Sequence, residues 1–262
     1  MNRVADIPLS REAIIAALPA ALHADLGEVH VFPELPSTNE WLLEQGACGD
    51  VCLAEMQTAG RGRRGRSWQS PPQKNIYFSL RWCFEVVPDF YGSLSLQVGL
   101  AVAQALQDAG LQGHGLKWPN DIYYQGRKLG GILLQTAQPL QQVVIGIGLN
   151  VNMQATDVEG IDQPWCSLTD ILGRSLDRNG LVALLLQHLV PALQQFPDRD
   201  SEKFIQNWQQ WDILTGKQVN IHTGQQILAG QVQGIDPQGQ LDVLLNSGEQ
   251  QYFSSADVSV RW

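Results

Sequence analysis

One stretch decides the fold, residues 115–152: GLKWPNDIYYQGRKLGGILLQTAQPLQQVVIGIGLNVN. It contains short runs rich in β-branched and aromatic residues, which are typical of strands. The pair Gln125-Gly126 separates two of these runs and predicts a hairpin turn. Pro119 lacks the N–H that a central strand would donate, so the KWPND segment (117–121) is predicted to be a turn or the rim of a sheet. The whole stretch predicts a strand, a hairpin and a further strand.

The flanking sequence adds further strands and several helices. Strands are predicted at 29–35, 51–57 and 75–84. A helix capped by Ser10 and divided by Pro19 is predicted at about 11–26. A second helix is predicted from Ser37 or Thr38 to Gly46. Further helices are predicted over 92–109 and at about 180–196 and 201–213. This order of elements predicts an α+β fold, a mixed β-sheet with helices.

From Gly216 onward the pattern changes to short strands. Turns are predicted at 236–239 (DPQG) and 246–248 (NSG), because these residue types favour the backbone angles of tight turns. Short strands at regular spacing predict a small C-terminal β-barrel of the SH3-like kind.

Composition limits the classes of function. The 262 residues include 17 Lys and Arg against 26 Asp and Glu, a net charge of −9. A net anion is a poor default binder of nucleic acid, because neutralising phosphates needs clustered cations. Residues 1–9 lack the features of a signal peptide, and no apolar run is long enough to cross a bilayer, so no membrane contact is expected. The four cysteines form no C-x-x-C and have no zinc spacing, which predicts free thiols in a reducing cytoplasm.

Four arginines nevertheless gather in the segment GRGRRGR, residues 60–66. Glycines let the backbone approach a ligand closely, and guanidinium groups are suited to phosphate and carboxylate. The segment predicts a flexible loop that orders when an anion binds. A solvated basic turn and an RNA-binding segment of the RGG type are the alternatives.

Glycines interrupt two of the predicted strands, at Gly130-Gly131 and at Gly146 and Gly148. Glycine inside a strand often marks the close approach of a ligand, so the pair of strands predicts a slot for a flat, apolar ligand. Lys128 precedes the first pair, and its alternative is a solvated strand end. Asn150 ends the later strand and is either a ligand contact at the rim or a turn residue.

Asp121 is the candidate for a metal site. Mg²⁺ prefers one or two carboxylates together with phosphate oxygens, although Asn120-Asp121 is explained equally well as a turn. A nucleophile elbow, an HExxH helix and a Walker loop are all missing from the sequence. The chemistry is therefore expected to bind anions without a covalent nucleophile.

Taken together, the motifs resemble the biotin protein ligase family. They are Ser37-Thr38-Asn39, the segment 57–68 (QTAGRGRRGRSW), KWPND, Arg127–Leu133 (RKLGGIL) and GIGLNVN, and they occur in the family's order. The resemblance covers roughly residues 30–260 and includes the C-terminal β module.

The resemblance implies a two-step reaction that consumes ATP. Biotin's carboxylate attacks the α-phosphate to give biotinyl-5′-AMP and pyrophosphate, and a lysine of the biotin carboxyl carrier protein of acetyl-CoA carboxylase then takes the biotinyl group. Biotin and ATP are the substrates and Mg²⁺ the metal. The implied fold is related to class II aminoacyl-tRNA synthetases.

The resemblance also implies the site residues. The catalytic residues are Lys128 and Arg63. The biotin-binding residues are Ser37, Thr38, Asn39, Gln57, Gly60, Arg61, Gly62, Arg63, Trp68, Lys128, Gly131, Gly146 and Gly148. The nucleotide-binding residues are Arg61, Arg63, Arg64, Arg66, Lys128 and Asn150.

The same resemblance suggests how the chain is divided. Residues 1–30 would be an N-terminal helical segment, 31–214 the catalytic domain and 215–262 the SH3-like domain. About 30 residues are too few for the helix-turn-helix domain of some bacterial members, so no DNA binding is expected. The protein is expected to be a cytoplasmic monomer or homodimer. The alternative function is a lipoate or octanoate ligase or transferase of the related fold.

Overall fold

The computed structural model describes residues 7–137, 139–158, 160–224, 226–254 and 259–261. Its centre is a seven-stranded sheet in the order β1-β2-β3-β7-β6-β5-β4. The strands are β1 (Val29–Phe32), β2 (Val51–Ala54), β3 (Ile76–Cys83), β4 (His114–Lys117), β5 (Asp121–Tyr124), β6 (Arg127–Thr136) and β7 (Gln142–Leu149). Only β1 and β2 pair in parallel, and the other neighbours are antiparallel, which confirms the predicted mixed sheet.

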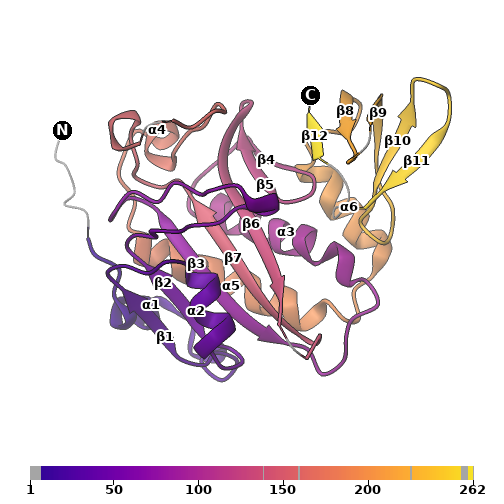
Figure 1. Cartoon of the computed structure of the whole chain (residues 1–262). Coiled ribbons are helices and arrows are strands. Elements are labelled where there is room, and N and C mark those ends of the chain that lie inside the picture. Colours follow the sequence, from indigo (N-terminus) through magenta and orange to yellow (C-terminus); the bar gives the residue numbers. More distant parts are fainter. Residues whose placement is uncertain (1–6, 138, 159, 225, 255–258, 262) are drawn as a thin grey trace.

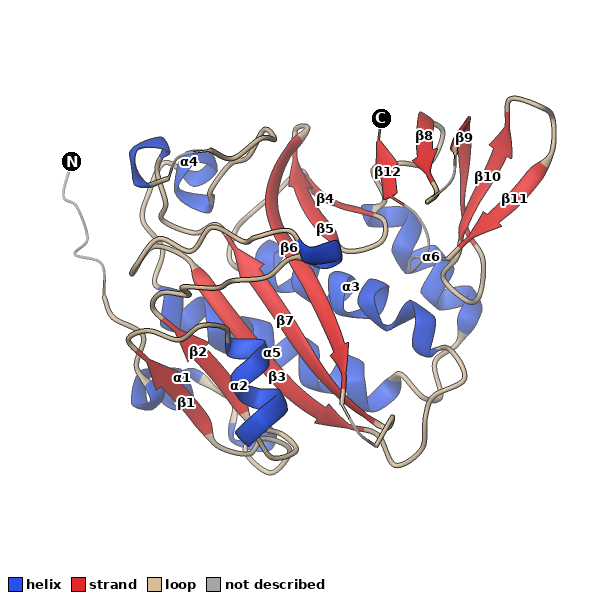
Figure 2. Ribbon diagram, viewed as in Figure 1, coloured by secondary structure: helices blue, strands red, loops and turns tan. Residues whose placement is uncertain are grey.

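Helices cover both faces of this sheet (Figures 1 and 2). Helix α2 (Thr38–Gln45) packs on one face against β2, β3 and β7. Helices α1 (Arg11–Ala17), α3 (Leu94–Asp108) and α5 (Arg178–Gln195) pack with the main core, and α6 (Ser201–Trp211) packs on α3. Strand residues alternate accordingly, because Cys52 lies in the small cluster under α2 and its neighbour Leu53 lies in the main core. Within the described ranges, no helix is long and apolar enough to cross a membrane.

Local chemistry sets the two ends of α2. The Oγ of Ser37 accepts a hydrogen bond from the Glu40 N–H at 3.4 Å, so the predicted cap is confirmed. At the other end Arg81 donates to the carbonyls of Leu42 and Gly46, at 2.7 and 2.8 Å. The Leu42 carbonyl also accepts from the Gly46 N–H, so Arg81 adds a second donor to the last turn and supplies a donor to the carbonyl of the cap residue Gly46. The helix is therefore fixed at both ends, with its first turn facing the site.

The sequence analysis missed one helix, α4 (Leu168–Leu172). Five residues are too few for an apolar repeat to appear. The helix instead depends on its ends, where Ser167 and Asp170 form a capping box and Gly173 adopts φ 68°.

The C-terminal region forms a separate five-stranded antiparallel sheet in the order β11-β10-β9-β8-β12, in agreement with the predicted SH3-like module. The strands are β8 (Gln218–His222), β9 (Ile227–Ile235), β10 (Leu241–Leu245), β11 (Gln250–Phe253) and β12 (Ser259–Arg261). The predicted turns are confirmed, with Gly239 and Gly248 at positive φ. Parts of the predicted segments lie outside the described residues: 1–6, Gln225, 255–258 and Trp262.

In the described residues, Trp118 and Arg199 both bond to the turn between β9 and β10 of this module. The indole N–H of Trp118, in the KWPND segment, donates to the Gly239 carbonyl at 2.9 Å. Arg199 donates to the Pro237 carbonyl at 2.7 Å and lies over the ring of Phe204. The turn between β9 and β10 is thereby held against the segment that also lines the site.

The expectation of four free thiols was wrong for two of them. Cys48 and Cys83 form a disulfide, with Cα atoms 5.7 Å apart, while Cys52 and Cys166 are free and buried. The pair is 35 residues apart in sequence, so short-range cysteine spacing could not reveal it. The antiparallel pairing of β2 with β3 brings the loop before β2 next to the end of β3.

We predict that this disulfide stabilises the fold. Cross-linking this loop restricts the unfolded chain, so Cys48→Ser should lower the free energy of unfolding by about 2–4 kcal/mol without reductant. With reductant, wild type and variant should unfold alike in urea. Alkylation of all four cysteines in unreduced, denatured wild type would contradict the assignment.

Candidate functional site

A cavity of about 890 Å³ opens between the basic loop, the start of α2 and the ends of β5, β6 and β7. It gathers residues that are more than 200 positions apart, because Arg261 of β12 also lines it. The predicted site residues that line it are Ser37, Thr38, Asn39, Gln57, Arg61, Gly62, Arg63, Arg64, Arg66, Trp68, Asp121, Lys128, Gly131, Gly146, Gly148 and Asn150.

Gly60 is the predicted residue that is not among the cavity's lining residues. It is buried in the base of the basic loop, where a Cβ would lie 2.7 Å from the Trp68 carbonyl oxygen. That carbon would also lie 2.9 Å from the Ser70 Oγ. Glycine is needed there for close packing of the loop.

One end of the cavity is lined with hydroxyl and amide groups. Gln57 Oε1 accepts from the Thr38 N–H at 2.9 Å and lies 3.2 Å from the Thr38 hydroxyl. The Ser79 Oγ lies 2.7 Å from Thr38 Oγ1 and 2.6 Å from Asn39 Oδ1. Asn39 also donates to Gln135 at 2.7 Å. These neutral donors and acceptors are buried and held in one network, the arrangement that orients a polar, uncharged ligand group.

Ser79 was missed by the sequence analysis. It is fully buried on β3 and has no motif around it, so its sequence context is that of any interior strand residue. The alternation of the strand was the available signal, because it places Ser79 on the same face as Tyr77.

The glycines of β6 and β7 leave space for side chains of the protein itself. Gly131 pairs directly with Gly148. A Cβ at Gly148 would lie 2.6 Å from the Trp68 ring, and one at Gly146 would lie 2.3 Å from Asn39 Oδ1. The predicted flat slot is therefore partly filled. The Trp68 ring lies over Gly131 and Gly148, and the Asn39 side chain lies over Gly146. Gly130 differs, because its missing Cβ makes room for Leu149 and Ile122 on the core side.

Trp68 presents an unsatisfied donor in this region. Its Nε1 is buried and has no hydrogen-bond partner in the described part of the chain. An unpaired buried donor costs about 1–3 kcal/mol. A ligand acceptor in the cavity would remove that cost.

The sequence predicted a flexible loop that orders when an anion binds, and the structure gives one conformation of this loop. Gly62 N–H donates to the Arg66 carbonyl at 2.7 Å, and the turn between them places Arg64 at φ 58°. Arg61 forms an ion pair with Glu40 of α2 at 2.5 Å. The loop thus lies over the start of α2, with the side chains of Arg61, Arg64 and Arg66 largely exposed.

Lys128 is one of the two predicted cations that are half-buried, the other being Arg63. Its Nζ is 2.7 Å from Asp121 Oδ1 and 5.5 Å from the centre of the Trp68 ring, and its side chain is only 13% exposed. The pairing of β5 with β6 places both charged residues on the same side of the hairpin. Such a cation, held by one carboxylate and covered by an indole, interacts more strongly with an anion than a solvated lysine does.

Arg63 is the arginine of the loop that reaches inward. Its Nη1 donates to Asn120 Oδ1 at 3.1 Å. Burial lowers the pKa of Arg63, and the neighbouring charge of Arg64 adds to the effect while Asp121 opposes it. Asn120 itself donates to the Ile132 carbonyl, so KWPND forms a bridge between the loop and β6.

Lys117 is a cavity residue that the sequence analysis left without a role. Burial lowers its pKa to about 8. Asp121 opposes this shift, and the nearby charges of Lys128, Arg66 and Arg261 add to it. The convergence of these four cations in one cavity of a chain with net charge −9 marks an anion site.

The metal prediction is only partly supported by geometry. Asp121 lines the cavity together with Asp162, but one of its oxygens contacts Lys128. Across the described ranges no group of three or more His, Cys, Asp or Glu could hold a metal ion. The residues fit Mg²⁺ only with phosphate oxygens completing its coordination.

Comparison with known proteins defines the class. Residues 31–150 match the Biotin/lipoate A/B protein ligase family, and residues 214–261 match the Biotin protein ligase C terminal domain. The bifunctional ligase/repressor BirA of Escherichia coli is 37% identical over 243 residues, which cover 90% of this chain and 75% of BirA. The chain therefore belongs to the biotin/lipoate A/B protein ligase family.

Within that family the chain is a biotin protein ligase. The biotin--[acetyl-CoA-carboxylase] ligase of Mycobacterium tuberculosis is 35% identical, over 82% of each chain. The solved structure of the Aquifex aeolicus biotin protein ligase in complex with biotin and ATP superposes with a TM-score of 0.79 and 30% identity, over 89% of this chain and 98% of the other. The fold and the function expected from the sequence are thereby confirmed.

The lowered pKa of Lys117 predicts how ATP binding depends on pH. Above about pH 8 the ammonium loses its proton in the free enzyme, the cavity loses positive charge, and the KM for ATP should rise. Lys117→Arg keeps its charge at every accessible pH and should flatten this rise. Steady-state kinetics from about pH 7 to about pH 10 test it, with the exposed Lys203→Arg as control. The same rise in Lys117→Arg as in wild type would contradict the role.

Proposed function

We propose that the cavity carries out both half-reactions of biotin ligation. In the first, biotin's carboxylate attacks the α-phosphate of ATP, biotinyl-5′-AMP forms and pyrophosphate leaves. In the second, the amine of a lysine on a biotin carboxyl carrier protein attacks the acyl carbon and AMP leaves. The observation that carries the proposal is the position of Lys128 and Arg63, two partly buried cations at one end of a cavity whose other end is neutral and polar.

The physical requirement is charge neutralisation. Two anions must come together, and a pair of unit charges 4 Å apart interacts by about 1 kcal/mol in water and by about 4 kcal/mol at an effective dielectric constant of 20. Lys128 and Arg63 act as fixed positive charges, which stabilise charge without reorganising during the reaction. The loop also excludes water, and the mixed anhydride needs this protection from hydrolysis.

Biotin would bind with its ring at the neutral end. We assign the ring to Ser37, Thr38, Asn39 and Gln57, whose hydroxyls and amides supply paired donors and acceptors. The acyl chain would lie against the Trp68 ring, which packs on Gly131 and Gly148, and next to Asn39, which packs on Gly146. The loop residues Gly60, Arg61 and Gly62 would close over it, and Lys128 and Arg63 would meet the carboxylate.

The nucleotide would occupy the cationic end. We assign its phosphates to Arg61, Arg63, Arg64, Arg66 and Lys128, and its remaining contacts to the region of Asn150, which lines the cavity beside the Lys128 and Cys166 carbonyls. Asp121 would hold a Mg²⁺ together with the nucleotide's phosphates. A bound Mg²⁺ supplies positive charge to the phosphates.

The remaining sequence predictions stay proposals. The chain would divide into segments 1–30, 31–214 and 215–262, act on a carrier domain of acetyl-CoA carboxylase in the cytoplasm, and not bind DNA. A gel-shift titration with the operator of a biotin operon tests the last point. Cell fractionation tests the predicted cytoplasmic location, because a reducing cytoplasm keeps most thiols reduced and the structure has a Cys48–Cys83 disulfide.

The direct test of function combines two assays. ATP–pyrophosphate exchange is measured with biotin and with lipoate, and a biotin carboxyl carrier domain is then weighed by mass spectrometry after incubation with biotin and Mg-ATP. Exchange with biotin alone and one added biotinyl group are expected. Exchange with lipoate alone would support the related lipoate chemistry instead.

Lys128→Ala should cut adenylate formation by several orders of magnitude, because removing one charge-stabilising donor already costs about 10²–10³-fold. The variant also leaves Asp121 unpaired in the cavity. Lys128→Arg keeps a positive charge beside Asp121, so single-turnover rates of the two variants separate the loss of charge from the loss of the ammonium group. Near-wild-type adenylation in both variants would exclude Lys128 from catalysis.

Arg63→Ala should mainly weaken retention of the adenylate, because Arg63 ties the loop to Asn120. Faster escape of biotinyl-AMP and promiscuous labelling of added proteins are expected. Arg174→Ala removes the same charge from an exposed position and is the control. Equal escape from the two variants would contradict a closing role for the loop.

A further inference from the structure

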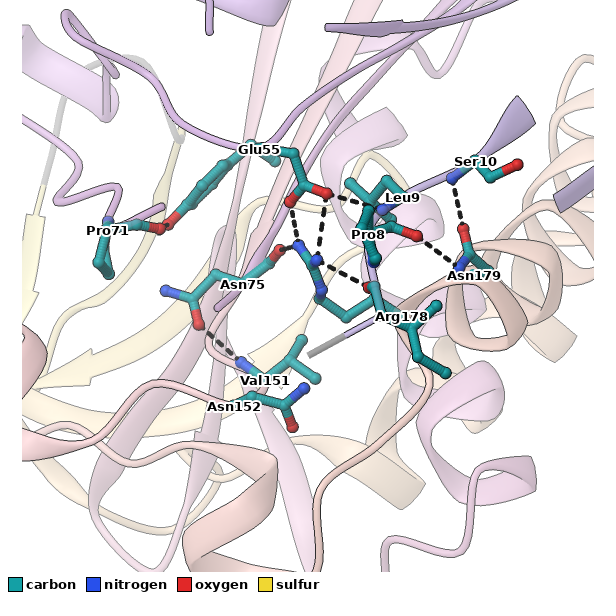
Figure 3. A network of polar contacts seen from close by, with 12 residues as sticks. Pro8, Leu9, Ser10, Glu55, Pro71, Asn75, Val151, Asn152, Arg178 and Asn179 are labelled. Atoms are coloured by element: carbon teal, nitrogen blue, oxygen red, sulfur yellow. Dashed lines mark hydrogen bonds and ion pairs between the residues drawn. The ribbon is translucent and has the colours of Figure 1, made fainter. Parts of the chain in front are cut away.

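A buried ion pair lies behind the basic loop, outside the cavity. Arg178, the first residue of α5, makes a two-pronged contact with Glu55, which follows β2 (Figure 3). The Nη1 to Oε2 distance is 2.5 Å and the Nη2 to Oε1 distance is 3.2 Å. The two side chains are 1% and 10% exposed.

Stability alone does not explain this pair. Removing two charges from water is costly, and apolar residues of similar volume often stabilise such positions equally well. A cation at the first residue of a helix is also disfavoured by the helix dipole. Arg178 carries both costs, so a positional role is the better account of its contacts.

The contacts of Arg178 join the two ends of one segment. Residues 56–74 connect β2 to β3 and contain the basic loop. Glu55 precedes the segment, and its carbonyl accepts from the Gln73 N–H at 3.0 Å. Asn75 follows it, and its carbonyl accepts from Arg178 Nη1 at 3.2 Å. Asn75 Oδ1 in turn accepts from the Val151 N–H, next to Asn150 of the cavity.

Residues 7–10, the N-terminal arm, cover this pair. The Leu9 N–H donates to Glu55 at 2.7 Å, and the Ile7 carbonyl accepts from Arg178 Nη2 at 3.1 Å. Asn179 holds the arm from the next position, accepting from the Ser10 N–H and donating to the Pro8 carbonyl, as Figure 3 shows. The arm therefore packs against the pair through these hydrogen bonds.

We propose that Arg178 is a positioning residue for the basic loop. By holding Glu55 and Asn75 together under the N-terminal arm, it fixes the two points from which the loop closes over the acyl-adenylate. The proposal rests on the closing role proposed above for the loop. Its consequence is that adenylate retention depends on a residue that touches neither substrate.

The test compares retention with stability in the full chain. Arg178→Lys keeps the charge and loses the two-pronged geometry. Arg178→Met/Glu55→Gln removes both charges, and it is the variant to assay if Arg178→Lys unfolds. Asn179→Ala loosens only the arm. Leu189→Ala, a buried position further along α5, is the matched control for general destabilisation.

The readouts are thermal unfolding, the KM for biotin and the rate at which preformed biotinyl-AMP escapes without carrier. We expect escape to rise roughly three- to thirty-fold in the two Arg178 variants, less in Asn179→Ala, and not in Leu189→Ala at a comparable loss of Tm. The rate of adenylate formation should fall less than the rate of escape rises, because Lys128 lies outside the loop.

Two outcomes overturn the proposal. If wild type retains biotinyl-AMP and the Arg178 variants release it at the wild-type rate, or no faster than Leu189→Ala at equal Tm, the positioning role is wrong while the function stands. If wild type forms no biotinyl-AMP, the proposed function fails and this proposal fails with it.

Discussion

The contact between the Lys128 ammonium and the Asp121 carboxylate organises the site. Asp121 Oδ1 lies 2.7 Å from Lys128 Nζ and holds the ammonium group near the start of β6. Three further cations converge in the same cavity. The carboxylate offsets part of the mutual repulsion of these cations. One acidic residue thus helps to hold several cations close together in a cavity proposed to bind anions.

The glycines of β6 and β7 determine how that charge is covered. Because Gly131 and Gly148 are paired and have no side chains, the Trp68 ring lies directly on the sheet and over Lys128. The basic loop continues from Trp68 toward α2 and KWPND, held by Arg61 at Glu40 and by Arg63 at Asn120. These two contacts hold the loop beside the cavity.

Much of the fold followed from the sequence, because its elements have strong local signals. The Gln125-Gly126 turn, the Ser37 cap and the glycine-marked strands all act within a few residues of their own position. The residues of the cavity were found through motifs that resemble a family. Their partners were missed where contacts depend on distant pairing: Ser79 is an ordinary strand residue until α2 packs on it, and Cys48 and Cys83 meet only through β2 and β3. Arg178 has no local signal at all, since its role depends on Glu55, 123 positions earlier.

A structure of the enzyme with biotinyl-5′-AMP is the most direct test of this account. We expect the biotin ring to lie among Thr38, Asn39 and Gln57. The acyl-phosphate oxygens should lie within about 3.2 Å of Lys128 Nζ and of an Arg63 nitrogen, and Trp68 should lie against the acyl chain. An adenylate bound outside the cavity, or bound inside it with Lys128 still paired only to Asp121 and the loop unchanged, would contradict it.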